Sequence, residues 1–422
     1  MSSTMTHDPL RAALEFREQL ASDKRRLAFF LGAGTSMAVG VPGIDGLTGK
    51  VADSLLDPLK SQFALVRSRL QGRANVEDVL NRIRLCRELL EGSKDGPQDG
   101  LTGVDAKKLD AAICGEIYKI MRADPPQGMK PHVTFAQWLH ALHASRECPV
   151  EIFTTNYDLL LERAMEEVGL PFFDGFIGSV APFFAPESVE ADGTKGSDIV
   201  YPPRAWTRLW KVHGSIGWHL TKEAVGGKTR ITRLTDRAPQ PGEELMIFPS
   251  REKYADSRKL PFLTYQDRLR RLISSGEALL VVAGYSFSDE HLNEILFQGL
   301  RANVRLAITV LAYGLPGGTG EAGDRKTPHD MLAYGERYRN LTVYGPDKAR
   351  IGGMLGDWTE PSRKRKDNEA WPFWDEARKQ FALGDFNALA SYLEEFIGIS
   401  TRTDRTQGQP PETPSGTVGM RS

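Results

Sequence analysis

The sequence predicts an α/β fold in which a parallel sheet is flanked by helices and interrupted by an inserted helical subdomain. Short runs of apolar and β-branched residues recur along the 422-residue chain, and each is followed by a turn or a polar segment. Such runs are typical of strands that helices cover on both faces. Amphipathic repeats at helical spacing also fill the long stretch between Leu31 and Val150, which is too long for one crossover helix.

The predicted strands are the apolar runs themselves. The run at residues 278–283 is the clearest, because all six of its residues are apolar. In chain order the runs lie at Leu27–Leu31, Val150–Thr154, Leu209–Val212, Ala278–Ala283 and Leu306–Leu311, with a weaker sixth at Leu341–Tyr344.

The predicted insertion spans about residues 48–145 and consists of helices. Apolar residues recur at intervals of three, four and seven within Val76–Leu90, and a similar pattern covers Leu109–Met121. The segments at 181–205 and 312–330 are rich in Gly, Pro and charge, which predicts surface loops. The segment at 401–422 has almost no apolar residue, so we expect a disordered C-terminal tail.

The composition excludes several classes of protein. With 54 Lys+Arg against 55 Asp+Glu, the chain is not a dedicated nucleic-acid-coating protein; the basic runs Arg268–Arg271 and Arg363–Lys366 are typical of solvated surface, and direct DNA contact stays open. Three scattered cysteines offer neither a metal clip nor a disulfide framework and favour the cytoplasm. We expect no secretory signal and no membrane helix, because no suitable apolar stretch occurs.

The turn after the first predicted strand reads Gly32-Ala33-Gly34-Thr35-Ser36. Two such glycines at a strand end let the backbone approach a pyrophosphate, and backbone N–H groups of the next helix then face the anion. The third glycine of a dinucleotide fingerprint is missing because residue 37 is Met, so this motif alone favours a tight strand–helix turn over a nucleotide site. The formal match at Gly318–Gly323 precedes no apolar helix and favours a loop.

Small and polar residues follow three further predicted strands. Ligands on doubly wound sheets bind at the carboxyl ends of the strands. Each loop alone also fits a structural role, since Asn and Asp form turns and cap helices and a lone His is usually structural. Together with the glycine turn, however, they place four loops at one sheet edge and predict a ligand site: Asn156-Tyr157-Asp158, His213-Gly214-Ser215 and Gly284 to Asp289.

These motifs together resemble the sirtuin superfamily, and specifically the bacterial sirtuin-like NADase family of antiphage defence. The resemblance implies a Rossmann-like sheet within a sirtuin-like NAD-binding catalytic domain over residues 1–400, with NAD as its substrate. The matching segments occur in the family's order: Gly32–Ser36, Pro42-Gly43 through Leu47-Thr48, Thr155–Asp158, Lys211–Ser215 and Gly284–Asp289.

The resemblance also implies a role for each loop. Asn156 and His213 would be the catalytic pair, and Asp158 would lie near the nicotinamide ribose or carboxamide. The pyrophosphate and the adjacent ribose would be held by Gly32, Ala33, Gly34, Thr35 and Ser36. The adenosine side would be lined by Gly214, Ser215, Gly284, Ser286 and Phe287.

The chain departs from sirtuin deacylases at two places. Those enzymes carry a zinc ribbon with two Cys-x-x-Cys pairs, and this chain has no such pair. Where they have Pro-Asp-Phe-Arg, this chain has Pro42-Gly43-Ile44-Asp45-Gly46. Both departures count against deacylation. We therefore expect metal-independent hydrolysis of NAD to nicotinamide and ADP-ribose, in which Asn156 holds a water and a ribose hydroxyl and His213 accepts a proton.

An enzyme that consumes NAD must be gated, and the resemblance implies an effector of abortive antiphage defence. Stand-alone chains of this layout resemble the partners of HerA-type hexameric ATPases, so such a partner and a homo-oligomer are expected. The inserted helices and Trp374–Ile397 offer interfaces, although each helix also fits packing on the core. Two alternatives stay open: an NAD-dependent deacylase or ADP-ribosyltransferase, and a non-catalytic NAD- or ADP-ribose-binding regulatory subunit of a DNA-processing ATPase complex.

Overall fold

The computed structural model describes most of the chain, in twelve segments. The predicted disordered tail at 401–422 and the Gly318–Gly323 motif lie outside the described residues. The described segments are 5–70, 74–90, 97–143, 146–190, 202–203, 206–222, 229–239, 243–247, 256–274, 276–314, 331–365 and 369–397.

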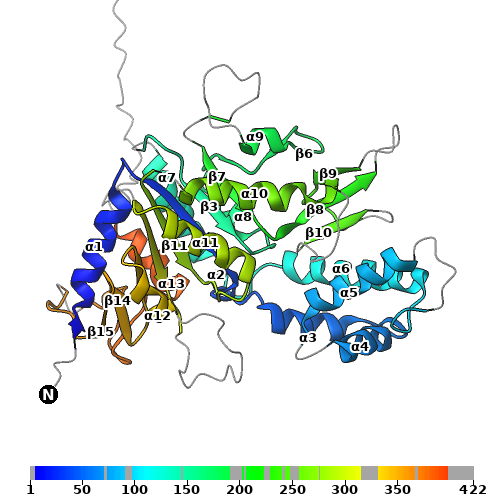
Figure 1. Ribbon diagram of the computed structural model, residues 1–422, viewed down its shortest axis with the longest axis horizontal. Coiled ribbons are helices and arrows are strands. Elements are labelled where there is room, and N and C mark those ends of the chain that lie inside the picture. Colours follow the sequence, from blue (N-terminus) through cyan, green and yellow to red (C-terminus); the bar gives the residue numbers. More distant parts are fainter. Residues whose placement is uncertain are drawn as a thin grey trace, which may run out of the picture.

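A ten-stranded sheet forms the centre of the molecule (Figure 1). The strands from β13 to β4 are all parallel, whereas β14 is antiparallel to both of its neighbours and β1 runs parallel to β15. In spatial order the strands are β1 (Thr6–His7), β15 (Met354–Trp358), β14 (Lys348–Ile351), β13 (Leu341–Tyr344), β12 (Leu306–Leu311), β11 (Ala278–Ala283), β2 (Arg26–Leu31), β3 (Glu151–Thr154), β7 (Thr207–Lys211) and β4 (Phe172–Phe173).

The parallel strands have the order of a Rossmann fold. Numbered along the chain, β2, β3, β7, β11, β12 and β13 take the spatial order 3-2-1-4-5-6. The predicted α/β class is confirmed, and a strand lies at each of the six predicted positions. The direction of winding changes between β2 and β11, which is where sheets of this kind bind ligands.

Helices cover both faces of this sheet. Along β2, Phe29 and Leu31 pack into one apolar cluster and Ala28 and Phe30 into another, as the alternation of a pleated strand requires. The first cluster is covered by α1 (Pro9–Ala21), α7 (Lys130–His143), α8 (Leu160–Glu167) and α13 (Phe386–Glu394). The second is covered by α10 (Asp256–Ser274), α11 (Glu290–Ala302) and α12 (Met331–Arg337).

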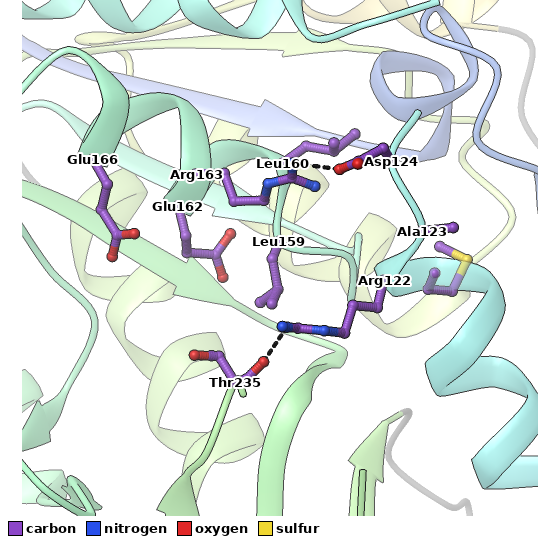
Figure 2. Close-up of a pocket in the computed structure, with 10 residues that line it drawn as sticks. Arg122, Ala123, Asp124, Leu159, Leu160, Glu162, Arg163, Glu166 and Thr235 are labelled. Carbon is purple, nitrogen blue, oxygen red and sulfur yellow. Dashed lines mark hydrogen bonds and ion pairs between the residues drawn. The ribbon is translucent and has the colours of Figure 1, made fainter. Parts of the chain in front are cut away.

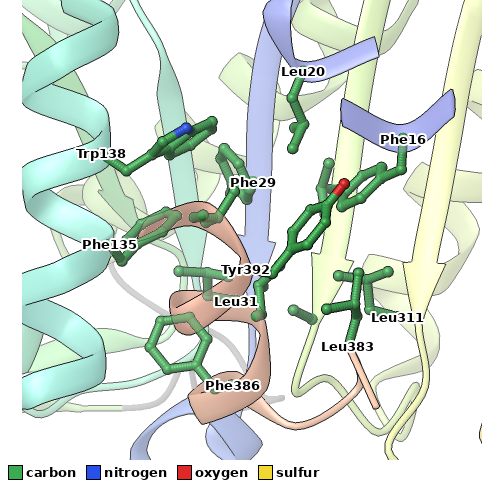
Figure 3. Close-up of a cluster of buried hydrophobic side chains, with 14 of the residues drawn as sticks. Phe16, Leu20, Phe29, Leu31, Phe135, Trp138, Leu311, Leu383, Phe386 and Tyr392 are labelled. Carbon is green, nitrogen blue, oxygen red and sulfur yellow. The ribbon is translucent and has the colours of Figure 1, made fainter. Parts of the chain in front are cut away.

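The C-terminal stretch Trp374–Ile397 packs on the chain itself. It contains β16 (Trp374–Asp375), β17 (Gln380–Phe381) and α13. Tyr392 stacks on Phe16 at 6.1 Å, and its hydroxyl donates to the carbonyl of Ala13 in α1 (Figure 3). The apolar face that the sequence offers as an interface is therefore buried against the core of its own chain.

The predicted helical insertion is present as a lobe beside the sheet (Figure 1). It has an apolar core of its own, formed by α3 (Ile44–Ser54), α4 (Leu59–Arg69), α5 (Val76–Leu90) and α6 (Gly103–Arg122). Its predicted end near residue 145 differs from the structure. Helix α7 belongs to the sheet, because Phe135 and Trp138 make edge contacts with Phe29 of β2, at 5.1 and 5.7 Å.

A second sheet was not predicted from the sequence. Its order is β10 (Glu244–Ile247), β8 (Gly214–Lys222), β9 (Thr229–Arg233), β6 (Phe183–Phe184) and β5 (Phe176–Ile177). The predicted loop at 181–205 thus begins with β6 and the short helix α9 (Pro186–Glu190). In the part of the chain that the structure describes, no helix is both long and apolar enough to span a bilayer.

Burial of α13 predicts a clear difference between two leucine substitutions. Leu389 is fully buried, whereas Leu56 in the lobe is 80% exposed. Leu389→Ala should destabilise the fold by about 2–5 kcal/mol, because it leaves a cavity in the core. Leu56→Ala should change stability by less than about 0.5 kcal/mol. Urea unfolding of both variants checks this; equal effects would mean that α13 is not part of the core.

Candidate functional site

The turn after β2 and the turn after β11 are joined through their backbones. The N–H of Gly34 donates to the carbonyl of Gly284 at 2.8 Å, and that of Gly32 donates to Ala283 at 3.0 Å. A Cβ on Gly32 would lie 2.5 Å from the Gly284 oxygen, and one on Gly34 would lie 2.7 Å from the Gly284 Cα. Gly284 itself has a φ of +65°. These three glycines are therefore required by the contact between the two turns.

Asn156 connects the loop after β3 to the glycine turn. Its Nδ2 lies within donating distance of the Gly32 carbonyl (3.1 Å), Thr35 Oγ1 (3.0 Å) and Ser36 Oγ (2.8 Å). Its Oδ1 accepts no hydrogen bond from the residues that the structure describes. The sequence predicts that this amide both donates to and accepts from the substrate, but the donor side is engaged within the protein, so only the acceptor is offered to a ligand.

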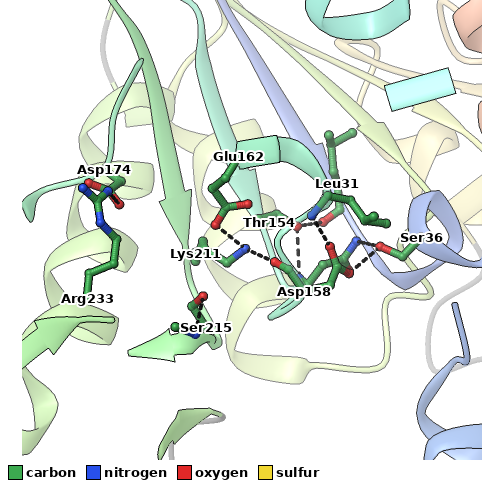
Figure 4. Close-up of polar contacts among 12 residues, drawn as sticks. Leu31, Ser36, Thr154, Asp158, Glu162, Asp174, Lys211, Ser215 and Arg233 are labelled. Atoms are coloured by element: carbon green, nitrogen blue, oxygen red, sulfur yellow. Dashed lines mark hydrogen bonds and ion pairs between the residues drawn. The ribbon is translucent and has the colours of Figure 1, made fainter. Parts of the chain in front are cut away.

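Asp158 is a buried connector between the same two loops (Figure 4). Its Oδ2 accepts from Ser36 Oγ at 2.6 Å, and its Oδ1 accepts from the N–H of Leu160 at the start of α8, at 3.0 Å. Its backbone carbonyl accepts from Lys211 Nζ, and Lys211 also pairs with Glu162 at 2.9 Å. Because both carboxylate oxygens accept hydrogen bonds within the protein, Asp158 positions the two loops, and its place near the nicotinamide ribose or carboxamide stays a prediction.

His213 pairs with Asp289 at the other side of the site. His213 Nε2 lies 3.0 Å from Asp289 Oδ2, while Asp289 Oδ1 caps α11 by accepting from the N–H groups of His291 and Leu292. Burial alone would raise the pKa of Asp289, but the hydrogen bond and charge of His213 and the two backbone N–H groups hold that pKa below its ordinary value. Asp289 is thus a carboxylate that fixes the imidazole in place.

The glycine turn offers fewer anion-binding groups than its sequence suggests. The N–H groups of Gly32, Gly34 and Thr35 already donate to backbone carbonyls, and the hydroxyls of Thr35 and Ser36 donate to the Gly32 carbonyl and to Asp158. The N–H of Ala33, in contrast, donates to no described residue, and the Ala33 side chain has no polar group. Of the N–H groups of residues 32–35, only that of Ala33 would then be available to a phosphate without breaking a described hydrogen bond.

The predicted adenosine-side residues are divided by the structure. Gly214 has a φ of +86° at the turn into β8, and Ser215 is buried beside it, with Oγ accepting from the N–H of Gly217 at 3.2 Å. Ser286 is held through its hydroxyl, 3.0 Å from that of Ser288. The side chain of Phe287 is buried in the core cluster on one face of the sheet and so supports the loop, while its place on the adenosine side stays a prediction.

Phe287 also has an unusual backbone conformation. Its φ is +54°, in the left-handed region that non-glycine residues seldom adopt. Asn293 Nδ2 donates to the carbonyl of Phe287 at 2.8 Å, and the Tyr285 ring lies 4.8 Å from the Phe287 ring. The loop after β11 is therefore held in one shape by α11 and by its own aromatic pair.

The ion pairs that support these loops, Lys211–Glu162 and His213–Asp289, were not predicted from the sequence. Lys211 and Asp289 lie inside the quoted motifs, but neither was given a role, and Glu162 was not singled out. The buried Lys211 side chain pairs with Glu162 and donates to the Asp158 carbonyl. It therefore ties the loop after β3 to the neighbouring strand β7. Burial raises the pKa of Glu162, and the positive charge of Lys211 lowers it in part. For Asp289 the sequence carries one signal: the residue stands immediately before an amphipathic helix, which is typical of an N-cap residue.

The basic run at Arg268–Arg271 is not an available cationic patch. Arg268 makes two 2.8 Å contacts with buried Glu151, which also accepts from the indole of Trp210 at 2.7 Å. Arg271 donates to the carbonyl of Glu190. In the second run, Arg365 pairs with Glu395 at 2.8 Å, and Lys366 lies outside the described residues. Neither finding favours DNA contact by these runs.

A cavity of about 540 Å³ lies between the end of α6 and α8 (Figure 2), where Leu159 and Leu160, which follow the loop after β3, form part of its wall. Arg163 pairs there with Asp124 at 2.6 Å, and Arg122 donates to the carbonyl of Thr235. None of the predicted site residues lines it; its walls are Met121, Arg122, Ala123, Asp124, Leu159, Leu160, Glu162, Arg163, Glu166 and Thr235. Within the described segments no group of three or more His, Cys, Asp or Glu side chains is placed to hold a metal ion.

Comparison with known proteins finds solved structures of Sir2 homologues. One is a Sir2 homologue–NAD complex, with 14% identity and a TM-score of 0.38, covering 90% of this chain and 95% of that chain. Another is a Sir2 homologue mutant with ADP-ribose, with 14% identity and a TM-score of 0.40, covering 91% and 98%. No curated protein matches the sequence. Residues 150–316, which carry β3, β7, β11 and β12 with Asn156, His213 and Asp289, match the family model of the SIR2-like domain.

Proposed function

We propose that the protein is an NAD glycohydrolase that cleaves the bond between nicotinamide and ribose. The observation that carries the proposal is the pairing of two groups at the carboxyl edge of neighbouring strands. Asn156 after β3 offers an amide oxygen, and His213 after β7 offers an imidazole fixed by Asp289. Both lie within the segment that matches the SIR2-like domain, beside the position where the winding of the sheet changes.

The chemistry of the bond suits these groups. As the C1′–N bond breaks, its electron pair stays on nicotinamide, which leaves as a neutral molecule, and positive charge develops on the ribose. Preorganised acceptors around the sugar stabilise that charge. Asn156 Oδ1 would accept a hydrogen bond from the ribose or from the attacking water, and His213 would orient a ribose hydroxyl. The Gly32–Ser36 turn would face the pyrophosphate, mainly through backbone.

The wider biological role is proposed from the resemblance. An uncontrolled NADase would empty its own cell of NAD, so we infer a gated effector of abortive antiphage defence acting in the cytoplasm. The gate would be homo-oligomerisation, a HerA-type hexameric ATPase, or both.

One observation favours a non-catalytic regulator that binds NAD or ADP-ribose within a DNA-processing ATPase complex. Several polar side chains of the predicted site, including Thr35, Ser36 and Asp158, are bonded inward. A deacylase or ADP-ribosyltransferase would instead need an acceptor. Product analysis separates the three: free nicotinamide and ADP-ribose support hydrolysis, a modified protein supports transfer, and unchanged but bound NAD supports a regulator. The assay is run on the chain alone and with the proposed HerA-type ATPase.

Substitution of the two central residues tests the assignment directly. His213→Ala should lower nicotinamide release by more than about 100-fold, and Asn156→Ala should do the same. Asn156→Ala should also cost about 1–3 kcal/mol of stability, because the buried donors and acceptors around Nδ2 lose a partner. Mass-spectrometric product analysis and thermal unfolding measure both effects. A wild-type rate in either folded variant would contradict the assignment.

Substitutions of Asp289 separate its two functions. Asp289→Asn keeps an oxygen that can cap α11 but removes the charge beside His213, so activity should fall about 10- to 1000-fold with little loss of stability. Asp289→Ala should lose both, with a further cost of about 1 kcal/mol. The check is nicotinamide release together with urea unfolding of each variant. Full activity in Asp289→Asn would show that the charge on this residue is dispensable.

A further inference from the structure

Lys211 stands out among the charged side chains of the fold. Of the lysines that the structure describes, it alone is buried in the core, with 2% of its surface exposed. Lysine is seldom buried to this degree unless it is paired, because removing an ammonium group from water is costly. The place of Lys211 at the end of β7, two residues before His213, therefore calls for an explanation.

Both partners of Lys211 belong to the segment that follows Asn156 (Figure 4). Its Nζ donates to the carbonyl of Asp158 and pairs with Glu162 Oε1 at 2.9 Å. Asp158 is two residues beyond Asn156, and Glu162 lies in the first turn of α8. A side chain of the strand that leads to His213 thus holds the loop that carries Asn156.

The backbone pairing of β3 and β7 stops before the candidate site. The last pair in register is Thr154 with Lys211, and the N–H of Val212 donates to the Thr154 carbonyl at 2.9 Å. Neither Asn156 nor His213 belongs to this ladder. The sheet alone therefore does not fix where these two side chains lie relative to one another.

Two bonds beyond the ladder supply this connection. The carbonyl of Asp158 accepts from Lys211, and the carbonyl of Tyr157 accepts from the N–H of Ile216 at 2.9 Å. Lys211 and Ile216 flank His213 in the sequence. Two successive peptide groups of the loop after β3 are therefore held from both sides of the histidine. One of the two holding groups is a side chain, which a substitution can remove.

The ion pair is poorly suited to a purely stabilising role. Glu162 Oε2 is buried and has no hydrogen-bond partner among the described residues. A buried ion pair with an unsatisfied oxygen rarely stabilises a fold more than an apolar pair of similar size would. The bond from Lys211 to the loop explains the pair better, because Glu162 then serves to offset the charge of the ammonium group.

We propose that Lys211 is a positioning residue for the cleavage of NAD, which fixes Asn156 relative to His213 by holding the Asp158 carbonyl. This rests on the proposed hydrolysis of NAD. The amide N–H groups of Asn156 tie it to the glycine turn, and Lys211 ties the same loop to the strand that leads to His213. A reacting group that moves by about 1 Å can cost about 100-fold in rate. Such a bond can therefore govern kcat while contributing little to the binding of NAD.

Two matched variants test this role against a purely structural one. Lys211→Met removes the donor, and Arg268→Met removes the cation of another buried ion pair, that with Glu151 at the opposite end of β3. Both should lower the melting temperature, because each leaves a buried carboxylate without its cation. Lys211→Met should also lower kcat about 10- to 100-fold, whereas Arg268→Met should keep the wild-type kcat. The Kd for NAD should stay within about threefold of the wild-type value in both.

The double variant Lys211→Met/Glu162→Met separates folding from positioning. Two apolar side chains of similar size replace the ion pair, so the melting temperature should return to near the wild-type value. The kcat should stay about 10- to 100-fold low, because the Asp158 carbonyl still lacks its donor. Added to Asn156→Ala, the double substitution should lower kcat by less than about threefold further, since both changes act on the same group.

Nicotinamide release is measured by mass below the melting temperature of each variant. A wild-type kcat in the double variant, or an equal loss of kcat in Arg268→Met, would overturn the role of Lys211 while leaving NAD hydrolysis intact. So would a full further loss in the Asn156→Ala background. A double variant that fails to fold would also overturn it, because the ion pair would then be structural. A wild type that releases no nicotinamide, alone or with the proposed HerA-type ATPase, would overturn both proposals.

Discussion

The structure depends on the close contact between the turns after β2 and β11. There the backbone of Gly34 meets that of Gly284, with room for no side chain on either, and the two strands pair side by side in register below. This contact lies where the winding of the sheet changes, so the helices after β2 and β11 leave toward opposite faces. A single added methyl group at Gly32 or Gly34 would move one turn away from the other, and the loops around them would follow.

The other loops are set by reference to that contact. Asn156 reaches the glycine turn with its amide N–H groups, and Asp158 reaches the same turn through Ser36. Lys211 holds Asp158 from the neighbouring strand. In the proposed NAD site, the groups that would face the ligand are the Asn156 oxygen, the His213 imidazole and backbone. A site with so few polar groups suits the cleavage of a glycosidic bond to a neutral leaving group, because this reaction needs well-placed acceptors more than a strong nucleophile.

The sheet and its loops were predictable because local sequence determines them. Continuous apolar runs identify buried parallel strands, and their carboxyl ends bring Asn156, His213 and Gly284 to one edge. The second sheet was not predicted, since strands such as β5 and β6 are two residues long and lack any periodicity. Helix α7 has the same amphipathic pattern as the lobe helices, and its tertiary contacts with Phe29 of β2 and Phe386 of α13 assign it to the sheet. The inward bonding of Asp158 leaves no trace in sequence spacing.

The central claim is that the edge formed by the turns after β2, β3, β7 and β11 is the NAD site. The most direct measurement is a crystal structure with carbanicotinamide adenine dinucleotide, in which a methylene replaces the ribose ring oxygen and the glycosidic bond resists cleavage. We expect the nicotinamide ribose analogue between Asn156 Oδ1 and His213, with the pyrophosphate at the Gly32–Ser36 turn. A dinucleotide bound instead in the cavity beside Arg122 and Arg163, or none bound at a saturating concentration, would contradict the claim.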